Sequence, residues 1–130
     1  MNTYQSVVWI DTHEAHVLRV ESEMLHVSTI HASRGPERSE AAPALEGRAD
    51  EASRFFHEVA RALDVADEIL VVGPSAVKLE FVRYMNRNEH ALDPRILGVE
   101  TVGHPTDERL AAYAALYFKA RRSDAGNGST

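Results

Sequence analysis

Carboxylates lie close to the first two apolar stretches of the chain. Asp11 directly follows the run Val7-Val8-Trp9-Ile10, and Glu21 and Glu23 come at or just after the end of the next apolar stretch. Several carboxylates that converge on one point can hold a pair of metal ions for hydrolysis. Asp is also favoured in turns, where its carboxylate accepts local backbone hydrogen bonds. We interpret Asp11 as a turn residue and keep a metal-dependent hydrolase or nuclease as an alternative function.

Histidines could supply metal ligands or groups that transfer protons. His13 and His16 flank the turn that contains Asp11, while His26 and His31 differ by an odd number and would face opposite sides of a regular strand. Because no histidine spacing matches a known metal site, we expect solvated histidines or histidines satisfied within the core. We therefore predict no metal ligand, no cofactor and no catalytic residue. Asp11 and His13 remain candidate functional residues.

The sequence His104-Pro105-Thr106-Asp107 is typical of a helix start. Thr is a favoured N-cap, Pro is tolerated at helix entrances, and an acidic residue in the first turn suits the helix dipole. We keep His104 and Asp107 as candidate functional residues beyond this structural role.

Two segments could contact phosphate. Gly73 to Lys78 has some likeness to a phosphate loop but lacks the second glycine and the Lys-Ser/Thr pair, which favours a plain strand-to-helix turn with a solvated Lys78. The segment from Ala32 to Asp50 combines turn formers with charges of both signs and one large apolar residue, and this predicts a mobile loop. Such a loop could contact RNA or be a solvated linker. The candidate RNA-binding residues are Arg34, Gly35, Arg38, Arg48, Arg54 and Lys78.

Composition narrows the class of protein. The chain has 130 residues, a formal net charge of −6 and no cysteine. The length predicts one domain, residues 1–122, followed by a disordered tail, 123–130. The negative charge argues against broad coating of nucleic acid, so no DNA binding is expected. The absence of cysteine excludes disulfides and thiolate sites. No apolar stretch has membrane-spanning length and no secretory signal opens the chain, so we expect a cytoplasmic protein with no membrane partner.

The apolar pattern predicts the elements that position these residues. Ile69 to Val72 is a continuous apolar run, typical of a strand buried on both faces, and helical spacing begins at Val77. Further patterns predict strands at 7–10, 15–21, 25–31 and 96–102, a helix at about 51–65 and a final helix that opens at Thr106. The predicted fold is α/β, with a mixed five-stranded sheet made of an antiparallel meander and βα units, flanked by three helices, close to a ribonuclease H-like topology. An exposed sheet edge would leave room for an oligomer or a protein-interaction module.

Several short motifs occur in an order that resembles a known family. They are Val7 to Ala15 with Asp11 in its turn, Ser53-Arg54-Phe55-Phe56 after the long loop, a strand that ends in Gly73-Pro74 with Lys78 and Phe81, and His104 to Asp107. Together they resemble the central domain of the archaeal and eukaryotic class-1 peptide release factors and of Pelota. The resemblance is nearest to small bacterial single-domain relatives described as translational machinery proteins, and it runs from Val7 to about Phe118.

The resemblance implies a non-enzymatic, translation-related protein that binds the ribosome or RNA. In release factors, the loop that corresponds to residues 32–50 carries Gly-Gly-Gln, which enters the peptidyl transferase centre. Here the loop reads Arg34-Gly35-Pro36-Glu37 and contains no glutamine. The departure argues against a role in peptide release. A ribonuclease H-like hydrolase that uses carboxylates around Asp11, or a protein-interaction or oligomerisation module, remains the alternative.

Overall fold

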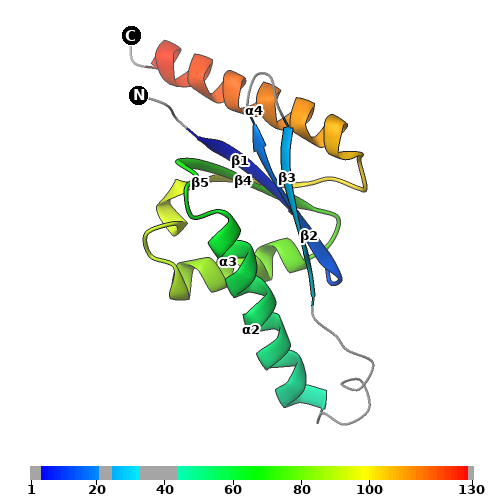
Figure 1. Ribbon diagram of the computed structural model, residues 1–130. Helices are drawn as coiled ribbons and strands as arrows, with labels where there is room; N and C mark the ends of the chain where they lie inside the picture. The colour runs from blue at the N-terminus through cyan, green and yellow to red at the C-terminus, as the bar shows by residue number, and fades with distance from the viewer. Residues whose placement is uncertain (1–3, 21–24, 33–43, 129–130) are drawn as a thin grey trace.

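Five strands form one mixed sheet in the computed structural model, which describes residues 4–20, 25–32 and 44–128 (Figure 1). The strands are β1 (Gln5–Ile10), β2 (Glu14–Val20), β3 (Leu25–His31), β4 (Glu68–Gly73) and β5 (Ile96–Thr101). The helices are α2 (Ala44–Ala62), α3 (Val77–Asn88) and α4 (Asp107–Gly128), with a short 3₁₀ turn at Asp93–Arg95. The order across the sheet is β3-β2-β1-β4-β5. β1, β4 and β5 run parallel, while β2 and β3 complete an antiparallel meander. The expected fold class is confirmed.

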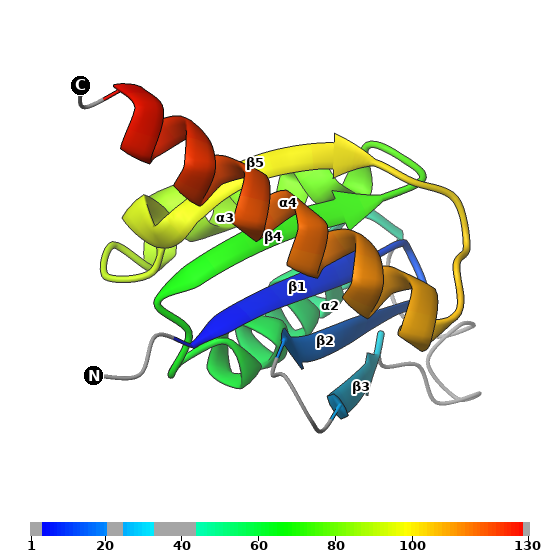
Figure 2. The same cartoon turned by 90° about the horizontal axis from the view of Figure 1, so that it is seen from above.

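The sheet separates two layers of helix. Figure 2 shows α4 in front of the sheet, with α2 and α3 behind it. The alternation of side chains along β1 explains both layers: Val8 and Ile10 belong to the apolar cluster under α2 and α3, whereas Val7 and Trp9 belong to the cluster under α4. β4 alternates in the same way, and its Val71 is fully buried. The continuous apolar run is therefore the mark of a strand covered on both faces.

Two helix boundaries differ from the sequence-based expectation. α2 begins at Ala44, so the loop expected from Ala32 to Asp50 is wrong in its second part. Residues 44–49 are mostly strong helix formers, and in the sequence they follow a proline, a residue type that is tolerated at the start of a helix. Residues 33–43 lie outside the described residues, so the mobility expected there stays a prediction.

α4 continues to Gly128. The disordered tail expected from Ser123 onward is therefore wrong for residues 123–128. Once a helix has formed, each further residue adds a hydrogen bond without a new nucleation cost, so weak helix formers can follow a long helix. Among the described helices, none is long and apolar enough to cross a membrane.

Candidate functional site at the end of β1

The turn after β1 is built around Asp11. Its carboxylate oxygen Oδ1 accepts hydrogen bonds from the backbone N–H groups of His13, at 2.8 Å, and of Glu14, at 2.9 Å. The Asp11 N–H in turn donates to the Glu14 carbonyl oxygen at 3.0 Å. These bonds satisfy the backbone where the chain reverses from β1 into β2. The interpretation of Asp11 as a turn residue is confirmed.

The connection from β5 to α4 passes over the same end of β1. The Trp9 indole N–H donates to the Gly103 carbonyl oxygen at 2.6 Å and so ties this connection to the sheet. The Trp9 ring also contacts two imidazoles: His16 edge-on, with ring centroids 5.6 Å apart, and His104, with centroids 5.1 Å apart. His104 Nε2 lies 4.0 Å from Asp11 Oδ2. The structure thus brings Asp11, His104 and the start of α4 together.

His16 joins β2 to the first turn of α4. Its Nδ1 lies 3.1 Å from Oδ1 of Asp107, and its Nε2 lies 3.0 Å from Oε2 of Glu14. We call Glu14, His16 and Asp107 the His16 cluster. A cavity of about 170 Å³ adjoins it, lined by Trp9, His104, Pro105 and Leu110 in addition to the cluster itself. Burial of His16 opposes its charge, but the hydrogen bonds and negative charges of Glu14 and Asp107 outweigh this effect and raise its pKa above the ordinary value.

The chemistry of the His16 cluster follows from this geometry. A protonated imidazole has two N–H donors, and here each faces a carboxylate oxygen. Neither ring nitrogen is then left to accept a proton from a substrate, so the arrangement suits a charged tie between two elements better than a general base. Among the described residues, no three His, Asp or Glu side chains are placed to hold a metal ion.

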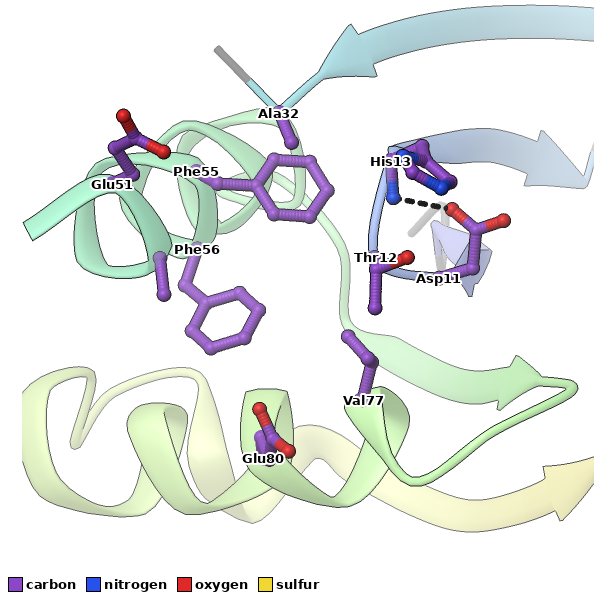
Figure 3. Close-up of a pocket in the computed structure, with 10 residues that line it drawn as sticks. Asp11, Thr12, His13, Ala32, Glu51, Phe55, Phe56, Val77 and Glu80 are labelled. Carbon is purple, nitrogen blue, oxygen red and sulfur yellow. Dashed lines mark hydrogen bonds between the residues drawn. The ribbon is translucent and has the colours of Figure 1, made fainter. Parts of the chain in front are cut away.

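A larger cavity, of about 610 Å³, lies on the other side of the Asp11 turn, between α2 and α3. Figure 3 shows the Phe55 ring extending from α2 toward the turn residues Thr12 and His13, and the Phe56 ring on the side of α3. Val77 and Glu80 of α3 close the opposite wall. His13 contributes its backbone N–H to the turn and is also one of the residues that line the cavity.

The candidate phosphate-binding residues have mixed outcomes. The expectation of a solvated Lys78 is wrong, because the residue is only 8% exposed and its ammonium group donates to the Ser75 carbonyl oxygen at 2.8 Å. The aliphatic stem of a lysine can pack on apolar surface while its head finds a polar partner, and here that partner is the turn before α3. Arg54 is exposed on α2, and Arg48 lies in the first half of that helix. Arg34, Gly35 and Arg38 lie outside the described residues, as do Glu21 and Glu23.

Sequence reasoning missed the roles of Trp9, Glu14 and His16. One signal was present: in the β1–β2 hairpin Trp9 is the direct partner of His16. A hairpin register read from the turn would have placed the two rings side by side. The approach of Asp107 has no such signal, because it lies 91 residues from His16 in the chain.

The helix cap expected at Thr106 is confirmed, since its hydroxyl oxygen accepts a hydrogen bond from the Arg109 N–H at 3.2 Å.

The fold is shared with parts of solved structures of a translation termination factor, of Pelota and of Dom34. No family model matches the chain, and no curated protein matches it in sequence. The archaeal translation termination factor aRF1 is 13% identical, with a TM-score of 0.58 over 97% of this chain and 42% of aRF1. Archaeoglobus fulgidus Pelota is 15% identical, with a TM-score of 0.57 over 95% of this chain and 38% of Pelota. Dom34 of S. cerevisiae is 14% identical, with a TM-score of 0.53 over 88% of this chain and 33% of Dom34.

The chain therefore spans less than half the length of each of these proteins. At such low identity, the likeness is one of fold. The fold of this protein is related to a portion of archaeal aRF1 and of the Pelota and Dom34 proteins.

Proposed function

We propose that this protein is a non-enzymatic, translation-related protein that binds the ribosome or RNA. The observation that supports the proposal is the fold match, which takes in 85–97% of the chain for aRF1, Pelota and the more completely matched Dom34 structure. These neighbours are described as a translation termination factor, as Pelota proteins, and as a termination-like factor involved in RNA quality control that interacts with Hbs1. A ribosome-binding protein of this kind would act in the cytoplasm.

The arginines between β3 and the middle of α2 are the proposed contacts to RNA. Arg34, Arg38, Arg48 and Arg54 all fall in this part of the sequence, and Gly35 lies among them. A guanidinium group can pair with phosphate through two parallel hydrogen bonds, which suits it to a nucleic-acid backbone. Lys78 is a weaker candidate than it seemed from the sequence, since its ammonium group is already engaged beneath the surface.

Co-sedimentation with ribosomes over a range of salt concentrations tests the proposal. The wild-type protein should co-sediment, and its binding should weaken as salt rises, because phosphate contacts release counterions. The variant with Arg34→Ala and Arg38→Ala should bind more weakly and with a shallower salt dependence, by about one unit of slope for each lost phosphate contact.

The matched control removes two arginines from another exposed surface. Arg83 and Arg87 are both exposed on α3, so Arg83→Ala with Arg87→Ala changes the net charge by the same amount. This control should bind like the wild type. Absence of ribosome binding at low salt would refute the proposal. Equal losses in the two double variants would refute the assignment to Arg34 and Arg38.

A further inference from the structure

The side of α4 that faces away from the sheet carries apolar side chains in contact with solvent. The helix packs on the sheet through Leu110, Ala114 and Phe118, which are all buried. Away from the sheet, Leu116 is 68% exposed and Tyr113 is 39% exposed. In Figures 1 and 2, no other described element lies over that side of the helix. α4 therefore has apolar surface both toward the sheet and away from it.

The other two helices do not share this pattern. From residue 51 onward, the exposed residues of α2 are all polar, and Leu79 is the one apolar residue among the exposed residues of α3. Between residues 109 and 121, the exposed apolar residues of α4 are Ala112, Tyr113, Ala115, Leu116 and Ala120. A helix that meets water on its outer side normally carries polar residues there, so a continuous apolar stripe is typical of a contact surface. We call Ala112, Tyr113, Leu116 and Ala120 the outer stripe.

Opposite charges lie beside the two ends of the outer stripe. Glu108 lies in the first turn of α4, and Lys119 follows eleven residues later. Both side chains are exposed, and neither has an ion pair within the described part of the chain. Eleven residues make about three helical turns, so the two charges lie on the same flank of the helix, about 16 Å apart along its axis. This flank is therefore acidic at one end of the stripe and basic at the other.

A second copy of the chain fits this surface when its α4 runs antiparallel. A two-fold axis at the level of Tyr113 and Ala114 places Glu108 of each copy beside Lys119 of the other copy, so a single contact forms two equivalent ion pairs. The same axis brings Leu116 of each copy to about the level of the other Ala112, where a small side chain leaves room for it. The charged flank and the apolar stripe thus agree on one register.

From this agreement of charge and shape, we propose that the protein forms a symmetric dimer through the outer stripe of α4. One pair of helices buries less than the roughly 1,200 Å² at which standard stable interfaces begin, so the dimer is weak and forms at high protein concentration. The proposal goes beyond the proposed binding of the ribosome or RNA and does not depend on it.

Sedimentation velocity of the full chain, from about 10 μM to about 1 mM, tests the dimer. The wild type should shift from monomer toward dimer across this range. Leu116→Glu places a charge in the middle of the stripe and should raise the dissociation constant at least about tenfold. The matched control is Leu79→Glu, the same substitution at a leucine that is 45% exposed on α3, and it should dimerise like the wild type. Circular dichroism checks that both variants are folded.

Reversal of the two charges tests the antiparallel register. Glu108→Lys and Lys119→Glu each place like charges at both contacts, and each should weaken the dimer by about tenfold. The variant that carries both substitutions has the net charge of the wild type and should recover most of the affinity, because both ion pairs form again with their signs exchanged. Glu58→Lys, at an exposed position on α2, makes the same change of charge as Glu108→Lys and should have no effect.

Three results would overturn the proposal. In the first, the wild type stays monomeric at every concentration. In the second, Leu79→Glu loses as much affinity as Leu116→Glu. In the third, the variant with both charges reversed dimerises no better than the single variants, which would show that Glu108 and Lys119 do not meet. None of these results bears on ribosome binding by the Arg34 and Arg38 variant, so the two proposals can fail separately.

Discussion

At the scale of single residues, His16 is a histidine whose positive charge, when the ring is protonated, stabilises the contact between two elements. Its side chain is 24% exposed, and a carboxylate lies at each ring nitrogen. Hydrogen bonds to charged groups are among the stronger polar contacts in proteins, although partial exposure reduces their value. His16 thus fastens the first turn of α4 to β2, beside the bond from Trp9 to Gly103.

We predict a pH-dependent effect of His16→Gln on stability. The pKa of His16 is raised in the folded protein, so its contribution is fully present below the pKa of an unfolded histidine and is lost as the pH rises through the folded pKa. The variant should be less stable than the wild type by about 1 kcal/mol at pH 5.5, and by less at pH 8.5. Urea unfolding at the two pH values measures this difference.

His57→Gln is the control, because His57 is exposed on α2 and its ring nitrogen is 4.0 Å from the nearest carboxylate oxygen, on Glu89. It should change stability little at either pH. A His16→Gln deficit that is the same at pH 5.5 and pH 8.5 would show that packing against Trp9, rather than the charge, is what His16 contributes.

At the scale of elements, two glycines permit close contacts of different kinds. A Cβ on Gly73, at the end of β4, would overlap the backbone carbonyl oxygen of Ile10 on the neighbouring strand. A Cβ on Gly98 would meet the hydroxyl end of the Tyr117 side chain from α4. Gly98 also lies beside an irregularity in the pairing of β4 with β5, where Leu70 pairs with Gly98 directly after Ile69 pairs with Ile96.

We predict that Gly73→Ala destabilises the protein more than Gly98→Ala. The strand backbone next to Gly73 has to shift, whereas the phenol of Tyr117 can rotate away from an alanine at position 98. Gly73→Ala should cost about 2 kcal/mol or more, and Gly98→Ala about 1 kcal/mol or less. Thermal unfolding of the two variants and of Gly103→Ala, where an added Cβ would meet nothing within 4 Å, gives the ranking. A larger loss at position 98 would contradict the prediction.

At the scale of the whole molecule, the sheet is one body with two covered faces, so its central strands should tolerate no charge. Val71 is fully buried on β4, while Val27 is 38% exposed on the edge strand β3. Val71→Asp should remove several kcal/mol of stability and unfold the domain, because an unpaired carboxylate would enter a close-packed core. Val27→Asp makes the same substitution on an exposed edge and should cost about 1 kcal/mol or less. Circular dichroism with thermal melting compares the two, and a normally folded Val71→Asp protein would contradict the described core.

We also predict that the whole protein does not release nascent peptide from ribosomes. The segment from Ala32 to Asp50 contains no glutamine, so the Gly-Gly-Gln of release factors has no counterpart there. In a release assay with ribosomes that carry a labelled peptide, the protein should give only the hydrolysis seen with buffer. Release above that level, lost on substitution of a residue between Ala32 and Asp50, would show that another group performs the reaction.

The sequence by itself determined the parts of this protein that depend on local interactions. The apolar runs of β1 and β4 and the helical spacing after Val77 each reflect which faces of one element meet the core. The turn at Asp11 could also be predicted from the sequence, because its hydrogen bonds reach only two and three residues along the chain. The Thr106 cap is local in the same sense.

Only the tertiary structure decided which of these local pieces meet. The packing of α4 on the sheet places Asp107 against His16, and no spacing in the sequence encodes a contact between residues so far apart. The start of α3 turns Lys78 beneath the surface, although helical periodicity alone placed it on the solvent side. The cavity at the end of β1 exists because α2 and α3 pack on one face of the sheet and meet the Asp11 turn at its end. Local pattern specifies each element and its buried face, whereas the positions of side chains from different elements depend on how those faces pack together.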